Sequence, residues 1–237
     1  MLGIVTGLEL EAELCRKVFK ELRFTDTKVI ITSGMGSVSG AEKAAQALCK
    51  KGVKHLVSLG VCGGLAPNVF SGDIIIPKQV IMDGKTHHVS EPWHTNIISH
   101  MPEAKTAPIL SVHTALASPL EKATAFEQSG AVAVDVESYA VLNIAQAHNI
   151  PALVIRAVLD MDNQSLPPAA LKGVDEHGKT RIGAVLRELL KRPQDLPDLV
   201  QLGKQSKLAK AALRDTINRT SRLRPLSIAG HEDRRTV

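Results

Sequence analysis

Short apolar runs alternate with amphipathic segments along most of the chain, and this alternation is typical of an α/β protein. The apolar runs predict buried strands at residues 2–6, 28–32, 53–59, 72–77, 79–82, 108–112, 131–136 and 152–158. Apolar positions at helical spacing predict helices at residues 9–22, 118–130, 138–148 and 180–191. The first helix carries Glu11 in its opening turn. The helix dipole favours an acid there, so the spacing alone leaves the function of Glu11 open.

Four ionisable residues stand beside the two apolar runs of segment 131–160. Asp135 and Glu137 close the first run, and Arg156 and Asp160 belong to the second. Two strands joined by one helix predict a β-α-β unit, whose strands are parallel and whose carboxyl ends open on one crevice. We therefore expect these four side chains at the mouth of an active site.

Three glycines follow the strand predicted at residues 53–59, within the sequence GVCGGLAP. Because Gly60, Gly63 and Gly64 leave the backbone amides uncovered, we interpret this segment as a turn that can hold a ribose or an oxyanion. Cys62 lies in the same segment. No basic or histidine neighbour in the sequence lowers its pKa, which favours a packing role over a nucleophile.

Segment 87–100 is polar and holds four histidines. It lacks a helical HxxxH pair and an accompanying set of acids and cysteines, so we do not expect a metal site. We interpret it as a mobile loop over the active site.

Length and composition indicate one large domain of a cytoplasmic protein. The 237 residues suffice for a single α/β core, which we place at residues 1–202. Aromatic residues make up only 3%, so few positions can stack on a base. Three cysteines favour a reducing compartment over a disulfide framework. The first residues lack the pattern of a signal peptide, and no apolar run is long enough to span a membrane.

The net charge of +5 is concentrated near the end of the chain. Residues 203–224 hold seven lysines and arginines against one acid, interleaved with leucine and alanine, which predicts a basic amphipathic helix. Such a helix can be a solvated cover of the core, or it can dock on an anionic membrane surface. Nucleic acid is the weakest partner, because no recognition module accompanies the charge. We expect residues 225–237 to be disordered.

The four charged residues of segment 131–160, together with Glu11, suit the cleavage of an N-glycosidic bond. That reaction needs an acid for the leaving purine, groups that grip the ribose as it becomes cationic, and a nucleophile at the anomeric carbon. Asp160 can protonate the purine if burial raises its pKa, and Glu137 can bind the ribose hydroxyls. Glu11 and Arg156 can hold the attacking water or phosphate. This chemistry needs no metal or organic cofactor, and phosphate is a candidate co-substrate.

Five motifs in order resemble the nucleoside phosphorylase and methylthioadenosine nucleosidase superfamily over residues 2–190. They are LGIVTGLELEAEL, SGMGSVSGAEKAA, LGVCGGLAP with GDIII, VDVES and IRAVLD. The resemblance implies a three-layer fold with a central twisted mixed β-sheet flanked by helices, and oligomers are usual in the superfamily. It implies a catalytic Glu11 and Arg156, and a proton donor at Asp160.

The same resemblance implies that the ribose is bound by Glu137. The neighbouring Val136 and the central motif residues Val61, Cys62 and Gly63 are then further substrate contacts. Ser58 and Val61 stand where the phosphorylases usually carry Arg and Ser or Thr, which argues against the ordinary phosphate site.

Within the superfamily, the hopanoid-associated phosphorylases are most similar, over SVHTALASPLEKATAFEQSGAVAVDVES, SLPPAAL and RPQDLPDLVQLG. This similarity implies removal of adenine from adenosylhopane, a lipid-linked nucleoside, with the basic helix held peripherally on the membrane. One alternative is a methylthioadenosine or S-adenosylhomocysteine nucleosidase. A dinucleotide-binding oxidoreductase lacks its GxGxxG motif here. A catalytically silent nucleoside-binding protein stays open, because Leu159 replaces the Ser that commonly precedes the catalytic Asp.

Overall fold

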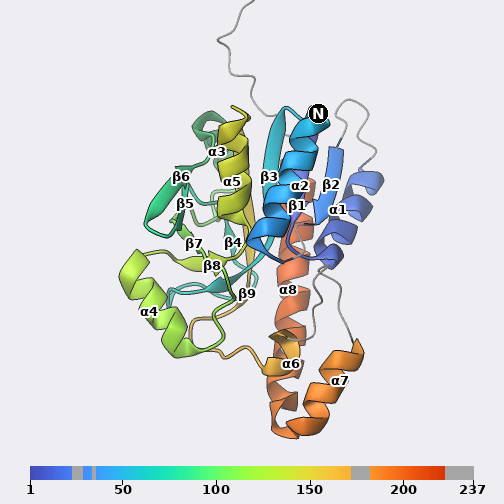
Figure 1. Ribbon diagram of the computed structural model, residues 1–237, viewed down its shortest axis with the longest axis vertical. Coiled ribbons are helices and arrows are strands. Elements are labelled where there is room, and N and C mark those ends of the chain that lie inside the picture. Colours follow the sequence, from blue (N-terminus) through green and yellow to red (C-terminus); the bar gives the residue numbers. More distant parts are fainter. Residues whose placement is uncertain (23–28, 34–35, 172–181, 222–237) are drawn as a thin grey trace, which may run out of the picture.

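The computed structural model describes residues 1–22, 29–33, 36–171 and 182–221. Within them the strands form one nine-stranded sheet with helices on both sides (Figure 1). The strands are β1 (Leu2–Thr6), β2 (Val29–Ser33), β3 (His55–Gly64), β4 (Ile74–Ile75), β5 (Gln79–Met82), β6 (Lys85–His88), β7 (Ile109–Ser111), β8 (Ala133–Asp135) and β9 (Ala152–Asp160). The helices are α1 (Glu9–Glu21), α2 (Val38–Lys50), α3 (Glu91–His100), α4 (Pro119–Ser129), α5 (Ser138–Ala147), α6 (Pro168–Leu171), α7 (Ile182–Lys191) and α8 (Leu196–Thr220), with a 3-10 turn, η1 (Pro193–Asp195).

The sheet is mixed, as the family resemblance implies. Its order is β2-β1-β3-β8-β7-β5-β6, and β9 pairs with β3 and β4 outside this path. β1, β2, β3 and β9 are parallel to their neighbours in this group, whereas the β3–β8, β4–β9 and β5–β6 pairs are antiparallel. The long strand β3 is therefore flanked by β9 along most of its length, by β1 at its start and by β8 at its end.

Helices α2 and α5 pack side by side on one face of the sheet, and α1 and α8 cover the other (Figure 1). The buried core between these layers is mainly aliphatic, with Val, Leu, Ile and Ala in most positions. Strand β9 lies at its centre, with eight of its nine residues buried. Burial of this much apolar surface is the main force that holds the strand in place.

The predicted direction of the strands in segment 131–160 was wrong. Its strand-helix-strand order is present as β8, α5 and β9, but β8 is antiparallel to β3 while β9 is parallel to it. β8 pairs in parallel with β7 instead. A short apolar run indicates that a strand is buried, but it carries no information about the direction of the strand. The sequence therefore provided no support for placing the carboxyl ends of β8 and β9 at the same edge of the sheet.

The predicted glycine turn is also wrong, because Gly60, Gly63 and Gly64 lie inside β3. The strand runs to Gly64, five residues past the predicted end. Glycine has low strand propensity, and this made the segment read as a turn.

The predicted mobile loop at residues 87–100 is instead the end of β6 followed by helix α3. Pro92 stands in the first turn of this helix, where a proline is well tolerated. Trp93, His94 and Ile97 are buried, and the ring nitrogen Nε2 of His94 donates to the carbonyl of Ile76 at 2.9 Å. This histidine is therefore a satisfied core residue. Among the described residues, no three His, Cys, Asp or Glu side chains are grouped so as to hold a metal ion.

Residues 203–220 of the predicted basic helix belong to the longer helix α8, so the boundary placed at residue 202 falls inside one continuous helix, and residues 222–224 lie outside the described residues. Its inner face is buried at Ala209, Leu213 and Ile217. On α7, Leu186 and Leu190 are exposed. Residues 225–237 lie outside the described residues. No helix in the described part of the chain has the length and apolar character needed to cross a bilayer.

Candidate active site

The glycines of β3 lie opposite the charged residues of β9. In the parallel pairing of the two strands, Gly60 is the partner of Arg156, and a shift in register after Cys62 makes Gly63 the partner of Asp160. A Cβ atom on Gly60 would lie 2.4 Å from Nη1 of Arg156 and 2.9 Å from both carboxylate oxygens of Glu11. Contacts that close are forbidden to real side chains, so the glycine-rich strand makes room for charged groups.

Arg156 is the centre of the first group of charges, which we call the Arg156 cluster: Glu11, Ser58, Asp135, Glu137, Ser138 and Arg156. The guanidinium is fully buried. Its Nε lies 2.6 Å from Oδ2 of Asp135, and its Nη2 lies 3.4 Å from Oε2 of Glu137. Nη2 also donates to the hydroxyls of Ser58 and Ser138, at 2.8 and 2.9 Å. Nη1 has no hydrogen-bond partner among the described residues, and it points to the place that Gly60 leaves open.

Asp135 is held rigidly, which fixes Arg156 in turn. Its carboxylate accepts the hydroxyl of Ser111 at 2.5 Å, together with the hydroxyl and the backbone N–H of Ser138. These donors come from β7 and from the first turn of α5, so two elements orient the acid. We expect Asp135 to act as a support for the arginine rather than to touch a substrate.

Glu11 enters the cluster from the first turn of α1. Its carboxylate accepts the backbone N–H groups of Leu8 and Val61, both at 2.8 Å. Glu137 enters from the start of α5, and a Cβ atom on Gly7 would lie 2.6 Å from its Oε1. The two glutamates therefore come from elements far apart in the sequence; Glu137 lies beside Gly7, just after β1, and Glu11 lies beside Gly60 in the middle of β3.

Burial dominates the acid strength of these groups. It raises the pKa of Glu11, although Arg156 and the backbone N–H of Leu8 oppose the shift. Burial raises the pKa of Glu137 to about 7, again against the effect of Arg156 and with the help of Asp135 and Glu11. Burial alone lowers the pKa of Arg156, but the surrounding carboxylates outweigh it, so the pKa is raised and the guanidinium stays charged.

Asp160 belongs to a second, separate group. Its carboxylate forms an ion pair with Lys122 of α4, and both side chains are almost wholly buried. Nζ of Lys122 also donates to the backbone carbonyls of Met161 and Gln164, at 2.6 and 2.9 Å. Burial raises the pKa of Asp160, and Lys122 opposes that shift.

The other predicted contact residues lie on β3 and just after β8. The backbone N–H of Val61 donates to Glu11. A Cβ atom placed on Gly63 would lie 3.4 Å from Oδ2 of Asp160. Burial raises the pKa of the Cys62 thiol well above its usual value, so the thiol stays protonated and unreactive. Val136 is half-buried between β8 and α5. The roles of these residues remain predictions.

Sequence reasoning brought Glu11, Glu137 and Arg156 together but missed Lys122. A signal was available. Lys122 stands three, four and seven residues before Ala125, Phe126 and Ser129, so it belongs to the inward face of α4. A lysine on such a face is rare unless it has a buried partner.

The chain is similar to nucleoside-cleaving proteins in sequence and in fold. A family model described as the phosphorylase superfamily matches residues 3–191. A curated relative, the 5′-methylthioadenosine/S-adenosylhomocysteine nucleosidase of Haemophilus ducreyi, is 24% identical over 200 residues, which is 68% of this chain and 84% of the relative.

Two solved structures illustrate the likeness in fold. The nucleosidase of the same type from Neisseria meningitidis, in complex with methylthio-immucillin-A, has a TM-score of 0.70 at 14% identity and covers 93% of this chain and 97% of its own. The futalosine hydrolase of Helicobacter pylori has a TM-score of 0.68 at 15% identity, with 92% and 97% covered.

Proposed function

Since the chain belongs to the phosphorylase superfamily and is an enzyme of the N-glycosyl hydrolase or transferase type, we propose that it cleaves the N-glycosidic bond of a 5′-substituted adenine nucleoside with water as the nucleophile. The observation that carries the choice of water is the charge of the Arg156 cluster. Three buried carboxyl groups, those of Glu11, Asp135 and Glu137, surround one guanidinium.

A phosphate dianion would have to enter beside these carboxylates. Like charges at such short range in a buried site repel each other strongly, whereas neutral water meets no such cost. Ser58 supplies a hydroxyl where the family's phosphorylases usually carry an arginine, so the cluster gains no second cation from that position. The described site therefore supports hydrolysis over phosphorolysis.

The same charges suit the transition state of the reaction. As the bond to the base breaks, the ribose becomes cationic. The carboxylate of Glu137 stabilises this cation and accepts hydrogen bonds from the ribose hydroxyl groups. Glu11 takes the proton of the attacking water, and its raised pKa makes it a stronger base than an exposed glutamate. Asp160 protonates the leaving adenine. The proposed reaction uses no metal or organic cofactor.

The test is the release of adenine with and without phosphate, with the sugar product identified by mass spectrometry. We expect equal rates in both conditions and a free ribosyl product. A rate that depends on phosphate, with a ribosyl phosphate as product, would refute the choice of water. No release from any adenine nucleoside would refute the enzyme assignment and favour the silent binding protein.

For the 5′ substituent we propose a hopane chain, so that adenosylhopane is the substrate. The resemblance to the hopanoid-associated phosphorylases supports this choice, and so does the surface of the structure. The similarity to the Haemophilus nucleosidase favours the alternative, methylthioadenosine or S-adenosylhomocysteine. Adenine release from adenosylhopane in liposomes, compared with methylthioadenosine in solution, separates the two. A higher kcat/KM for the soluble nucleoside would exclude the lipid substrate.

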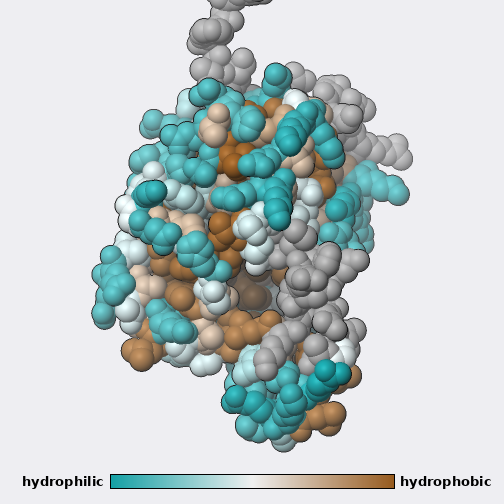
Figure 2. Space-filling model, viewed as in Figure 1, coloured by the Kyte–Doolittle hydropathy of each residue, from teal (hydrophilic) through white to brown (hydrophobic). Residues whose placement is uncertain are grey.

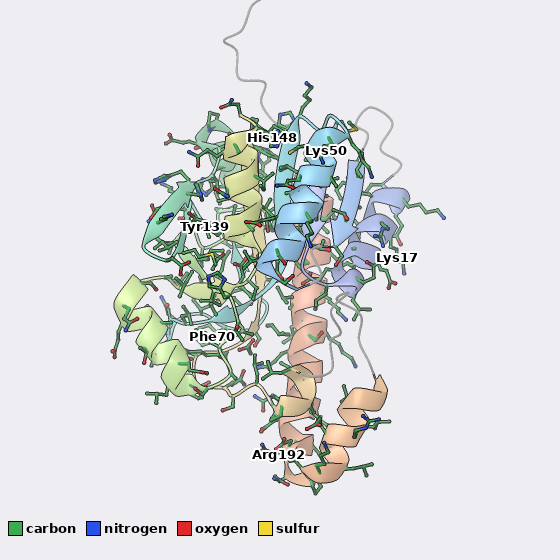
Figure 3. All side chains as sticks on the ribbon, viewed as in Figure 1. Lys17, Lys50, Phe70, Tyr139, His148 and Arg192 are labelled. Carbon is green, nitrogen blue, oxygen red and sulfur yellow. The ribbon has the colours of Figure 1, made fainter. Side chains whose placement is uncertain are left out.

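The surface that supports a lipid substrate is the projecting end of the molecule formed by α7, η1 and the first half of α8, which we call the helical tip (Figure 1). Five of its apolar side chains are at least half exposed: Leu186, Leu190, Leu196, Val200 and Leu208. Figure 2 shows apolar and hydrophilic residues side by side at this end, and Figure 3 places Arg192 there, far from Tyr139 at the start of α5. Exposed leucines beside Lys and Arg suit the surface of an anionic bilayer.

We propose that the helical tip binds such a surface, and point variants test it better than truncation. Because Ala209, Leu213 and Ile217 are buried, removal of α8 would expose the core. Leu190→Ser should weaken flotation with vesicles that contain anionic lipid. Leu120→Ser is the control, since Leu120 is 77% exposed on α4, outside the tip. Equal flotation of both variants and the wild type would exclude the tip as the binding surface.

A further inference from the structure

The buried lysine beside Asp160 is a costly feature that the proposed reaction has not yet used. Lys122 has no exposed surface, and all three of its hydrogens are taken up by Asp160, Met161 and Gln164. Burial of a charged lysine is unfavourable unless it is paired, and an apolar side chain of the same length would fill the space at lower cost. The presence of a lysine at this position therefore suggests that it controls the protonation of Asp160.

The surroundings of the pair contain few other charges. Cys62 and Gly63 of β3 lie on one side, and the thiol of Cys62 is neutral. On the other side a polar cavity of about 270 Å³ separates Asp160 from Asp198 and Gln205 of α8. The centre of the Arg156 cluster lies four residues earlier on β9, which is two repeats of the strand. Lys122 is thus the immediate charged partner of Asp160 in the described structure.

We propose that Lys122 positions Asp160 and is the reservoir of the proton that Asp160 delivers to the leaving base. This inference rests on the proposed function and deepens it. At neutral pH a lysine paired with a carboxylate holds one transferable proton between them, and the pair titrates as a unit. A carboxylate that is ionised in the resting enzyme can then still act as the acid.

The proton transfers balance over one turnover. Nζ of Lys122 passes a proton to the carboxylate of Asp160, and the carboxyl group passes a proton to the base. The electron pair of the glycosidic bond leaves with the base, water bonds to the anomeric carbon, and Glu11 takes the proton of that water. Lys122 has then lost one proton and Glu11 has gained one. Both return to their starting state by exchange with solvent through the open site.

This role predicts a distinctive pH profile. In the wild type, activity at high pH is lost only when the pair gives up its last proton. In Lys122→Met the only proton is that of Asp160 itself. Although burial raises the pKa of Asp160, it remains a carboxyl group, and the alkaline limb of kcat should move down by more than about two pH units.

Lys122→Arg separates the proton reservoir from the positioning effect of a cation. An arginine keeps the positive charge and the donors but does not release a proton inside a protein. We expect this variant to bind nucleoside within about threefold of the wild type and to lose kcat by about 100-fold or more. Lys43→Met, on the exposed side of α2, is the control for loss of a lysine charge and should leave both values unchanged.

Wild-type adenine release is measured first, so an inactive wild type counts against the proposed function. With an active wild type, an unmoved alkaline limb in Lys122→Met, or full kcat in Lys122→Arg, overturns the role of Lys122 alone. Should the variants fail to fold, the wild type still decides the question. The alkaline limb of its kcat should lie well above the range of a carboxyl group, and a limb within that range contradicts the proposal.

Discussion

The two groups of buried charge differ in how their charge is balanced. In the Arg156 cluster three carboxyl groups share one guanidinium, whose Nη1 has no partner among the described residues. In the second group one lysine meets one aspartate, and every hydrogen of the lysine is bonded. The first group keeps an excess of negative charge that a cationic sugar can use, and the second keeps a mobile proton. The proposed active site thus stabilises a cationic sugar at the Arg156 cluster and stores a proton at the Lys122–Asp160 pair.

The largest expected effect concerns the proton of the second group. Asp160→Asn removes the acid but keeps the shape, so adenine release should fall by about 100-fold to 10,000-fold while nucleoside binding persists. Single-turnover release and equilibrium binding measure the two quantities. Asp83→Asn, at an exposed position, is the control. Unchanged turnover in Asp160→Asn would remove the donor role and, with it, the difference between the two groups.

Loss of the cation should cost more stability in the cluster than in the pair. Arg156→Met leaves buried acids uncompensated and should lower the free energy of unfolding by about 3–5 kcal/mol in urea. Lys122→Met leaves one carboxyl group, which can take up a proton, so its loss should be smaller. Arg214→Met, at a half-exposed pair with Glu21, should lose at most about 1 kcal/mol. Equal losses at Arg156 and Lys122 would contradict the distinction.

Gly60→Ala tests whether the space beside the cluster is needed. The added methyl group would meet Nη1 of Arg156 and both oxygens of Glu11, which should cost about 1–3 kcal/mol and lower kcat. Gly203→Ala is the matched control, because nothing lies within 4 Å of its added methyl group inside α8. That change should stabilise the protein by about 0.5–1 kcal/mol. A Gly60→Ala variant as stable and active as the wild type would refute the role of the open strand.

The smallest effect is a gain of stability at Glu137. Its pKa of about 7 in the folded protein lies above the ordinary 4.5, so its ionisation destabilises the fold as the pH rises through that interval. Glu137→Gln should remove this loss and raise the free energy of unfolding at pH 8 by about 1 kcal/mol, with little change at pH 5. The acid limb of kcat/KM near pH 7 should disappear together with most of the activity. Thermal unfolding at both pH values checks the stability; a lower stability at pH 8 would contradict the excess of negative charge.

The sequence predicted most elements of the fold because their apolar patterns are strong. α1, α5 and β9 lie within two residues of their predicted bounds. The direction of β8 and the extension of β3 to Gly64 were missed, since both depend on partners rather than on local preference. Helix α3 was not predicted, because the polar residues around Pro92 mask its apolar positions.

For the site, the sequence supplied the acids and the arginine but not their grouping. Glu11, Glu137 and Arg156 were expected together, and they lie together. Asp160 was expected with them but pairs with Lys122, which comes from a helix 38 residues earlier. An ion pair between distant elements leaves no periodic trace, so only the inward position of Lys122 on α4 hinted at it.

The packing of α8 also sets the order in which a newly made chain can become active. Strand β9 carries Arg156 and Asp160, and its outer side is covered by a helix whose core residues, Leu213 and Ile217, lie some sixty positions later. During synthesis the earlier strands can pair before that helix exists, but the back of β9 stays exposed to water. The charges of the site can therefore be locked in place only after the residues of α8 have left the ribosome, and we expect a chain terminated before Leu213 to be inactive.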